Sequence, residues 1–348
     1  MNTVIGGAIM AAQLRVGIIG TGRIGKLHGN NLAYLVPTAK VEAVADIFMN
    51  DATREWAASI GVEKVYNDPE KIFQDPDVDA VFICSSTDSH ADFMIKSARA
   101  GKHIFCEKPI HTDPVKIREA LAEVEKAGVK LQVGFVRRFD HNHKKVRDVI
   151  ASGRLGEPHV VKVSSRDPEP PSPEYVATSG GIFVDMMIHD FDMVRYLAGS
   201  EVTEVSTYGT VKVDEGIGKA GDVDTAIVML KFESGAIGVI DNSRAARYGY
   251  DQRVEVHCDK GCVQDNNDLI DTATISTAEG VLSERPKWFF LERYNDAFVQ
   301  EVRDFVDAIN NDTQTPVGGI DGLMPVLMAI AAKKSMDEGR SVKISEVE

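Results

Sequence analysis

Three ionisable side chains stand at helical spacing between Gly180 and Asp192: Asp185, His189 and Asp192 itself. Residues three and four positions apart lie on one face of a helix, so the spacing predicts an acidic edge with an imidazole in its middle. Such a group could transfer protons in catalysis. The pattern is also typical of metal ligands, or of a polar face on a buried helix, where Asp185 near the helix start is favoured by the helix dipole.

A glycine-rich turn near the start of the chain is the first element that must serve this chemistry. Residues 14–19 are apolar, residues 20–25 read Gly-Thr-Gly-Arg-Ile-Gly, and residues 26–35 have helical spacing. This order is typical of dinucleotide binding, because the glycines allow a tight turn, close approach of the backbone to a pyrophosphate and close helix packing. The pyrophosphate is expected at the helix N-terminus. The cofactor contacts predicted here are Gly20, Gly22, Arg23 and Ile24.

An acidic residue follows the next predicted strand, residues 41–45. This residue, Asp46, stands about twenty positions after the last glycine, where a carboxylate can bind the adenosine ribose hydroxyls. A 2′-phosphate would meet its negative charge, and residues 47–49 offer no Lys or Arg to neutralise it. The sequence therefore predicts NAD as the cofactor, although an acidic residue that simply ends a strand remains the alternative.

Strands and helices continue to alternate through residue 127. Strands are expected at residues 80–84 and 103–106, and helices at residues 51–60, 89–100 and 113–127. This alternation predicts an α/β fold with a doubly wound parallel sheet, whose ligands bind at the carboxyl ends of the strands.

Two loops follow strands at that edge of the predicted sheet. Residues 85–90 supply hydroxyls and a helix start near the expected second half of the cofactor, and Lys108 follows the next strand directly before a proline. A lysine held in such a turn could orient a substrate hydroxyl and ease its deprotonation. The alternative is an exposed loop lysine. The cofactor contacts expected from these loops are Ser86, Thr87, His90, Glu107 and Lys108.

Composition excludes several classes of partner. The net charge of −14 argues against a nucleic acid or an anionic membrane surface. The four cysteines suit a reducing compartment. Residues 258–262 read Cys-Asp-Lys-Gly-Cys, which we interpret as a hairpin turn rather than a zinc site, and we expect no metal.

The first thirteen residues do not resemble a targeting signal. Residues 1–13 have no basic region and their apolar run is broken, which is not typical of a signal peptide, and Met10 could be the functional start. No stretch reaches the roughly eighteen apolar residues of a membrane span. We therefore expect a cytoplasmic, soluble protein.

The pattern changes near Arg137, and at 348 residues the chain is long enough for two domains. We predict an NAD-binding domain over residues 13–136 and an α+β domain over residues 137–348 with an open, largely antiparallel sheet. The proline-rich residues 167–174 are expected to form a surface loop that could serve as a lid. Of two neighbouring tyrosines between predicted strands, we predict that Tyr250 lines a ligand pocket, and the alternative is an ordinary tyrosine at a strand end.

Taken together, these residues resemble the Gfo/Idh/MocA oxidoreductase family. The resemblance rests on the segment 16–25, on the Cys-Glu-Lys-Pro turn at 106–109, and on the Gly-Gly-x-x-x-Asp-x-x-x-His pattern at 180–189, and it covers nearly the whole chain. Segments 134–140 and 187–192 are most similar to inositol 2-dehydrogenases within that family. One departure is Phe298, where some inositol dehydrogenases carry a tyrosine that meets the substrate.

The resemblance implies roles for individual residues. Lys108 would contact the substrate and the nicotinamide ribose, His189 would be the general base, and Asp185 would bind a substrate hydroxyl while orienting His189. Asp192 would be structural support. The implied substrate-binding residues are Arg138, Arg166, Asp185, His189 and Tyr250.

The activity so implied is NAD-dependent oxidation of a secondary hydroxyl of a cyclic polyol, with myo-inositol and its 2-keto product as the first choice. Alternatives are scyllo-inositol or an aldose as substrate, and a non-catalytic NAD-sensing regulator. The family also implies a homotetramer or dimer that forms through the free face of the second sheet. A zinc alcohol dehydrogenase is disfavoured, because the dinucleotide-binding pattern begins at residue 14 with no ligand set before it.

Overall fold

The computed structural model describes residues 13–348, and the chain divides into two compact units. Unit 1 extends to Phe135 and also contains Phe298–Leu323, while unit 2 contains Val136–Ala297 and Met324–Glu348. The sequence predicted two continuous domains, so the membership of Phe298–Leu323 in unit 1 is a difference from that prediction.

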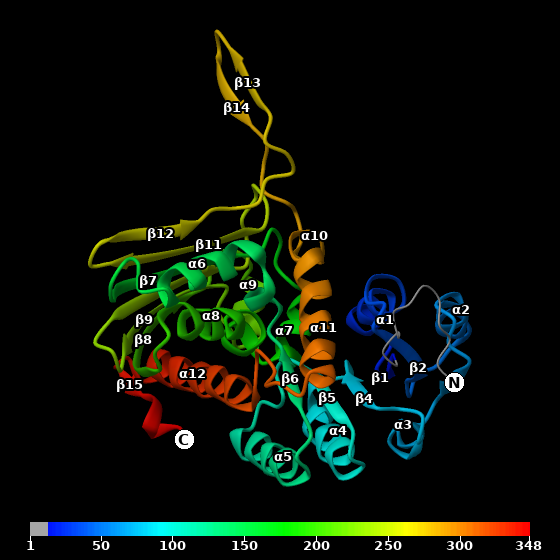
Figure 1. The fold of residues 1–348 in the computed structure, drawn as a ribbon. Helices are drawn as coiled ribbons and strands as arrows, with labels where there is room; N and C mark the ends of the chain where they lie inside the picture. Colours follow the sequence, from blue (N-terminus) through cyan, green and yellow to red (C-terminus); the bar gives the residue numbers. More distant parts are fainter. Residues whose placement is uncertain (1–12) are drawn as a thin grey trace. The chain divides into compact units, whose positions relative to one another are not determined.

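A parallel six-stranded sheet forms the centre of unit 1 (Figure 1). The strand order is β3-β2-β1-β4-β5-β6. Successive strands are added first on one side of β1 and then on the other, as in a doubly wound fold, which confirms the predicted fold class. The short strand β3 was not predicted, because its three residues are only half-buried and carry no apolar run. The strands are β1 (Leu14–Ile19), β2 (Ala39–Ala45), β3 (Lys64–Tyr66), β4 (Ala80–Ile83), β5 (His103–Glu107) and β6 (Leu131–Gly134).

Helices cover both faces of this sheet, as its nearly all-apolar strands require. Val16 and Ile18 of β1 belong to a buried core with the α1, α2 and α11 side of the unit, where Phe305 is completely buried. Gly17 points to the opposite face, against Ile72 of α3. The helices are α1 (Arg23–Leu35), α2 (Asp51–Ser59), α3 (Glu70–Gln74), α4 (Thr87–Arg99), α5 (Pro114–Ala127) and α11 (Asn295–Asn310), whose first three residues lie in unit 2.

Unit 2 is built on a seven-stranded sheet with the order β12-β11-β7-β10-β9-β8-β15. β7 and β10 pair in parallel, and the other pairs are antiparallel, so the sheet is mixed and largely antiparallel as predicted. β11 and β12 are antiparallel, and the pair nearest their connection is Cys258 with Gly261, which confirms the predicted hairpin turn. The strands are β7 (Pro158–Arg166), β8 (Val202–Thr210), β9 (Thr225–Phe232), β10 (Ile237–Ser243), β11 (Asp251–Cys258), β12 (Gly261–Asp265) and β15 (Val342–Lys343).

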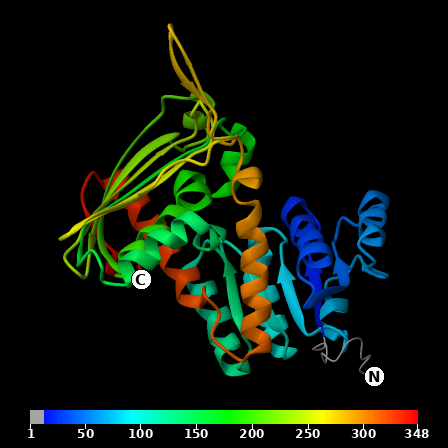
Figure 2. The same cartoon turned by 45° about the horizontal axis from the view of Figure 1, so that its top comes forward.

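One face of the sheet in unit 2 is covered by helices and the other is open (Figures 1 and 2). The alternating buried and exposed residues of β9 show this directly. A separate hairpin, β13 (Thr274–Thr277) with β14 (Gly280–Ser283), extends from the unit with every residue exposed. The helical elements are η1 (Val136–Phe139), α6 (His141–Ala151), α7 (Pro173–Ser179), η2 (Ile182–Met186), α8 (Ile188–Ala198), α9 (Glu215–Lys219), α10 (Phe290–Arg293), α12 (Gly319–Glu338) and η3 (Ile344–Glu346), with α12 entering unit 2 at Met324.

The proline-rich segment forms the expected loop over residues 167–172, and its last two residues begin α7. Pro173 occupies the first turn of α7, where its missing N–H is not needed, and the Ser172 side chain accepts a hydrogen bond from the backbone N–H of Tyr175. Among residues 13–348, none of the helices combines the length and apolar character needed to cross a bilayer.

Candidate functional site

The glycine turn of unit 1 has the geometry that a dinucleotide requires. Gly20 has a φ of +90°, and a Cβ there would lie 2.6 Å from the backbone of Cys84. A Cβ on Gly25 would lie 1.9 Å from the carbonyl oxygen of Gly20, so α1 can pack this closely only with glycine. A Cβ on Gly22 would meet no protein atom within 4 Å.

The start of α1 has no side-chain cap. Gly22 is the N-cap, and no side chain caps the helix. Arg23 and Ile24 occupy its first turn. Because the first N–H groups of a helix have no partner within the helix, this end fits a pyrophosphate.

Asp46 stands just beyond the end of β2, and the glycine turn holds its carboxylate. Its Oδ2 accepts hydrogen bonds from the N–H (2.7 Å) and the hydroxyl (2.8 Å) of Thr21, and Oδ1 accepts from the N–H of Phe48 (2.8 Å). Burial acts to raise the pKa of Asp46, but these hydrogen bonds outweigh it and lower the pKa. The side chain is therefore a fixed anion beside the predicted ribose position.

The loop after β4 begins α4, with Ser86 as its N-cap and Thr87 as its first residue. His90 is buried, and its ring nitrogens lie 2.9 Å from the carbonyl oxygen of Pro109 and 3.0 Å from that of Ser85. Burial lowers the pKa of His90. The ring thus joins the loop after β4 to the loop after β5.

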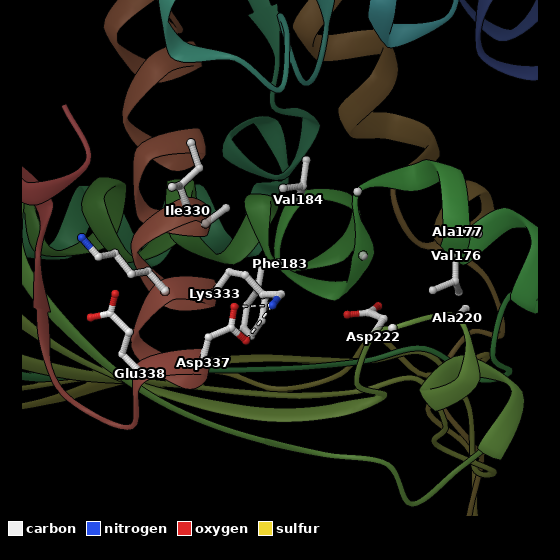
Figure 3. A pocket seen from close by; sticks show the side chains of 15 residues that line it. Val176, Ala177, Phe183, Val184, Ala220, Asp222, Ile330, Lys333, Asp337 and Glu338 are labelled. Carbon is white, nitrogen blue, oxygen red and sulfur yellow. Dashed lines mark hydrogen bonds and ion pairs between the residues drawn. The ribbon is translucent and has the colours of Figure 1, made fainter.

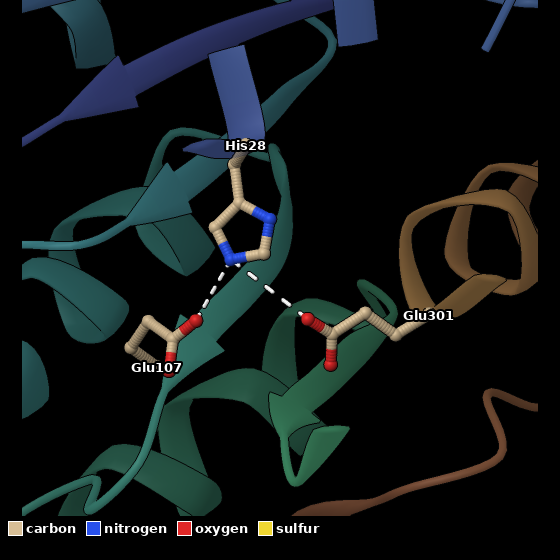
Figure 4. Close-up of side chains that lie close together, drawn as sticks. All are labelled: His28, Glu107 and Glu301. Atoms are coloured by element: carbon tan, nitrogen blue, oxygen red, sulfur yellow. Dashed lines mark hydrogen bonds and ion pairs between the residues drawn. The ribbon is translucent and has the colours of Figure 1, made fainter. Parts of the chain in front are cut away.

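Glu107 is the last residue of β5, and a cis peptide bond joins Lys108 to Pro109 directly after it. The Glu107 Oε1 atom lies 2.8 Å from Nε2 of His28, so this carboxylate is turned towards the interior of unit 1 (Figure 4). Lys108 stands at the carboxyl end of β5, the edge at which ligands of such sheets bind.

In unit 2, Asp185 and His189 lie on two different helical segments. Asp185 belongs to the π-helical turn η2, and His189 to the first turn of α8, instead of both lying on one regular α-helix as predicted. Gly180 and Gly181 precede this turn with φ angles of +88° and +74°, and the Met187 N–H donates to the carbonyl of Ile182 at 2.8 Å in the wider π pattern. Single π turns of this kind occur frequently at functional sites.

The Asp185 carboxylate has two donors within its own unit. Its Oδ1 accepts from the hydroxyl of Tyr175 at 2.9 Å, and its Oδ2 accepts from Nη1 of Arg244 at 3.0 Å. The same Arg244 nitrogen lies 3.8 Å from Oδ2 of Asp167. Burial raises the pKa of Asp167 to about 6, with Arg244 opposing the shift. Two carboxylates and one guanidinium thus gather beside η2.

The sequence prediction did not include Asp167, Arg244 or Tyr175. Asp167 directly follows β7, in the same position relative to its strand as Asp46 has to β2, so the rule that found Asp46 could have found it. Arg244 follows β10 directly. No local signal in the sequence distinguishes it, because its partner Asp185 is distant along the chain.

Beneath α8 lies a buried polar network that the sequence also did not reveal. Arg137 Nη1 lies 2.5 Å from Oδ1 of Asp190, and Nδ2 of Asn242 donates to Oδ2 of the same carboxylate at 2.8 Å. Arg137 Nη2 lies 3.2 Å from Ser165 Oγ and 3.4 Å from the hydroxyl of Tyr250. Burial raises the pKa of Tyr250 to about 12, so this predicted substrate residue is a buried neutral phenol bound to Arg137.

The other two predicted substrate contacts are also held by protein partners. Arg138 donates to both oxygens of Asp192, at 2.8 Å and 2.5 Å. Arg166 pairs with Asp241, and its Nη1 lies 3.2 Å from the hydroxyl of Tyr248. The geometry therefore gathers Asp167, Asp185 and Arg244, rather than these arginines, around the π turn.

A cavity of about 540 Å³ adjoins the π turn within unit 2 (Figure 3). Gly180, Gly181 and Val184 line one side, and Lys333 and Asp337 of α12 form an ion pair on another. Asp222 also lines the cavity and accepts a hydrogen bond from the backbone N–H of Ile182 at 2.8 Å. The first residue of the π turn is therefore fixed from the cavity side.

Comparison with known proteins identifies both halves of the chain. Residues 14–135 match the oxidoreductase family with an NAD-binding Rossmann fold, and residues 143–264 match the GFO/IDH/MocA C-terminal domain. The myo-inositol 2-dehydrogenase of Thermotoga maritima is 48% identical over 334 residues, which is 96% of this chain and 99% of that protein. The inositol 2-dehydrogenase of Rhizobium meliloti is 42% identical over 332 residues, covering 95% and 99%.

Solved structures agree with these matches. A probable dehydrogenase from Thermotoga maritima superposes with a TM-score of 0.94 at 48% identity, over 96% of this chain and 100% of that one. The scyllo-inositol dehydrogenase of Lactobacillus casei, solved with NAD(H) and scyllo-inositol, has a TM-score of 0.87 at 29% identity, over 96% and 99%. The fold, the glycine turn and these matches together show that the chain belongs to the Gfo/Idh/MocA family of NAD-dependent oxidoreductases.

Proposed function

We propose that this protein oxidises a secondary hydroxyl of myo-inositol to the 2-keto product with NAD. The observation that carries the proposal is the group of Asp167, Asp185 and Arg244 beside the helix turn that bears His189. Carboxylates accept hydrogen bonds from vicinal hydroxyls and a guanidinium donates to them, so the group suits a neutral polyol. The names of the curated relatives from Thermotoga maritima and Rhizobium meliloti support the same substrate.

In this proposal His189 removes the hydroxyl proton. An imidazole suits the step because its ordinary pKa lies close to working pH. Asp185 binds a neighbouring hydroxyl and favours the imidazolium that forms, and Tyr175 and Arg244 hold its carboxylate in place. Lys108 contributes an ammonium that favours the developing alkoxide. Bound NAD supplies the acceptor for the hydride that leaves the carbinol carbon.

The remaining predicted residues receive supporting roles in the proposal. Gly20, Gly22, Arg23 and Ile24 bind the pyrophosphate, Asp46 binds the adenosine ribose, and Ser86 and Thr87 lie near the second half of the cofactor. Glu107 and His90 act on Lys108 through the loop that they hold. Arg138, Arg166 and Tyr250 shape the substrate side of unit 2 through the partners described above.

The test compares His189→Ala with a matched control, His159→Ala, at an exposed histidine of the same unit. NADH formation is followed with myo-inositol, and NAD affinity is measured by calorimetry. We expect the His189 variant to lose at least a hundredfold in kcat with NAD affinity within twofold of the parent, because general-base catalysis contributes about 10²–10⁴-fold. An active His189 variant would remove the histidine from this role, and an inactive parent that still binds NAD would favour the regulator.

A second substrate is specifically suggested by the Lactobacillus casei relative, which is named for scyllo-inositol. The two inositols differ in the orientation of a single hydroxyl, so kcat/KM for myo-inositol, scyllo-inositol and D-glucose ranks the candidates directly. A higher kcat/KM for scyllo-inositol would replace our substrate assignment while leaving the roles of His189 and Asp185 intact.

We further propose that the open face of the seven-stranded sheet binds a second copy of the chain. Four apolar side chains on neighbouring strands are exposed there, and the Tyr208 side chain is the most exposed at 73%. Apolar patches of this kind mark association surfaces. The Met229→Glu variant should shift the mass measured by light scattering towards the monomer, and an unchanged mass would exclude this face. The four residues are Tyr208, Ile227, Met229 and Ile237.

A further inference from the structure

The interior of unit 1 contains a second cluster of titratable groups, His28, Glu107 and Glu301, and the function proposed above gives no role to Glu301 (Figure 4). His28 belongs to α1, Glu107 ends β5, and Glu301 belongs to α11, so three separate elements bring them together. The side chains of His28 and Glu301 are completely buried. Such a cluster demands an explanation, because an ionised carboxylate without partners is very unfavourable in an apolar interior.

Glu107 has its partner, whereas Glu301 does not. Nε2 of His28 lies 2.8 Å from Oε1 of Glu107 but 3.9 Å from Oε1 of Glu301. Both carboxyl oxygens of Glu301 are buried without a hydrogen-bond partner. The backbone carbonyl of Glu301, in contrast, accepts from Nε2 of Gln132 at 2.7 Å. The backbone of α11 is therefore hydrogen-bonded at Glu301, and the group without a hydrogen-bond partner is the Glu301 carboxyl.

The surroundings make ionisation of Glu301 still less favourable. The His28 ring packs edge-on against Phe82, Phe105 and Phe298, with centroids 5.6, 5.0 and 6.0 Å away. The nearby titratable groups from the other elements are Glu107 and Cys106 of β5, Cys84 after β4 and His28 of α1. Burial, followed by the charge of Glu107, raises the pKa of Glu301 well above its usual range.

Either a metal ion or a proton could neutralise this carboxyl, and the distances favour the proton. Ligands around a tetrahedral zinc ion, bound at about 2.0–2.1 Å, lie about 3.3 Å from one another. The 2.8 Å separation of His28 and Glu107 is a direct hydrogen bond, and the 3.9 Å separation of His28 and Glu301 is too long.

We propose that Glu301 holds a proton at neutral pH. The cluster then contains a single carboxylate, Glu107, which is hydrogen-bonded to His28. Glu107 directly precedes Lys108. A Cβ on Gly134 would lie 3.0 Å from the Glu107 carboxylate, so this carboxylate is closely packed against the backbone of β6. Glu301 is then a positioning residue: ionising it would place a second negative charge beside Glu107 and displace the turn that carries Lys108. This last step rests on the role proposed for Lys108, whereas the protonation itself does not.

Infrared spectroscopy of the full chain tests the protonation directly. The parent minus Glu301→Gln difference spectrum at pH 7 should contain a carboxylic-acid C=O band that shifts in ²H₂O, because a carboxylate has no such band. A difference spectrum without it would overturn the proposal. One equivalent of bound metal in the purified protein, measured by mass spectrometry, would also overturn it.

The pH dependence of turnover tests the positioning role separately. The parent should lose kcat/KM for myo-inositol as the pH rises into the range where the infrared band disappears. Glu301→Gln keeps the neutral form at every pH, so this alkaline decline should be absent from the variant. Superimposable profiles would refute the positioning role even if the infrared band is present. An inactive parent would refute the proposed function and leave the infrared result unaffected.

Discussion

The buried pair of Arg137 and Asp190 gives the sharpest stability prediction. Asp190→Asn keeps the shape of the side chain but replaces one acceptor oxygen by an NH₂ group. Because Asp190 accepts from Arg137 on one oxygen and from Asn242 on the other, the new NH₂ faces the Arg137 donor in one orientation, and in the other it requires the Asn242 amide to turn and present its Oδ1. The Arg137 charge also remains buried without the carboxylate that pairs with it directly.

The magnitude follows from the burial of this pair. The side chains of Arg137 and Asp190 are 6% and 0% exposed, and removing one partner of such a pair destabilises a protein by about 3–5 kcal/mol. A matched control is Asp148→Asn, at the pair of Lys144 and Asp148, which is 2.8 Å long with side chains 55% and 54% exposed. Asp148→Asn should lower the free energy of unfolding by at most about 0.5 kcal/mol.

Urea unfolding of both variants, followed by tryptophan fluorescence and circular dichroism, measures the two free energies. With a slope of about 3 kcal/mol per molar urea, Asp190→Asn should lower the midpoint by about 1–1.7 M, and the control by less than about 0.2 M. In the Arg137→Met/Asp190→Asn double variant, the free energy of unfolding should fall by less than the sum of the decreases in the two single variants, because no unpaired guanidinium remains buried. Equal losses for Asp190→Asn and Asp148→Asn would refute the reasoning.

Three further outcomes follow from the geometry. Asp46→Ser should raise the KM for NAD by about 10–100-fold, because it removes a charged hydrogen-bond acceptor. It should also lower the ratio of kcat/KM with NAD to kcat/KM with NADP. An unchanged ratio would contradict the ribose role of Asp46. Asp167→Asn should be less active yet more stable at pH 7, on the order of 2–3 kcal/mol, because the parent loses stability as the pH rises from 3.8 to about 6. The advantage should therefore vanish in unfolding curves measured near pH 4. Gly25→Ala, whose Cβ would clash with the Gly20 carbonyl, should lower NAD affinity at least tenfold by calorimetry, whereas Gly128→Ala, in open space at the end of α5, should not.

The sequence predicted the fold and the cofactor because these depend on local patterns. Alternating strands and helices, a glycine turn and one acidic residue at a strand end were enough for the parallel sheet and for NAD. The short strand β3 and the exposed hairpin β13–β14 gave no such signal. The free hairpin has no buried face, so hydrophobic alternation could not identify it.

The site was less accessible to prediction because its polar contacts join distant parts of the chain. Arg137 and Asp190 are 53 residues apart, and nothing in the sequence distinguishes them from a surface arginine and a surface aspartate. His90 and Glu107 were recognised as residues of the cofactor loops, but the direction of a side chain depends on burial, and both turn to partners inside the unit. The π turn at Asp185 is set by two left-handed glycines and by Asp222, which lies far along the chain.

The membership of Phe298–Leu323 in unit 1 has a consequence for the order in which the protein is made. Val302, Phe305 and Val306 of α11 complete the core around β1, and all three are fully buried. A ribosome delivers the six strands of that sheet well before these side chains, with nearly all of unit 2 emerging in between. The nascent sheet therefore keeps an uncovered apolar face until late in translation, which is the kind of surface that chaperones protect. The first unit to begin synthesis therefore cannot complete its core until most of the second unit has been made.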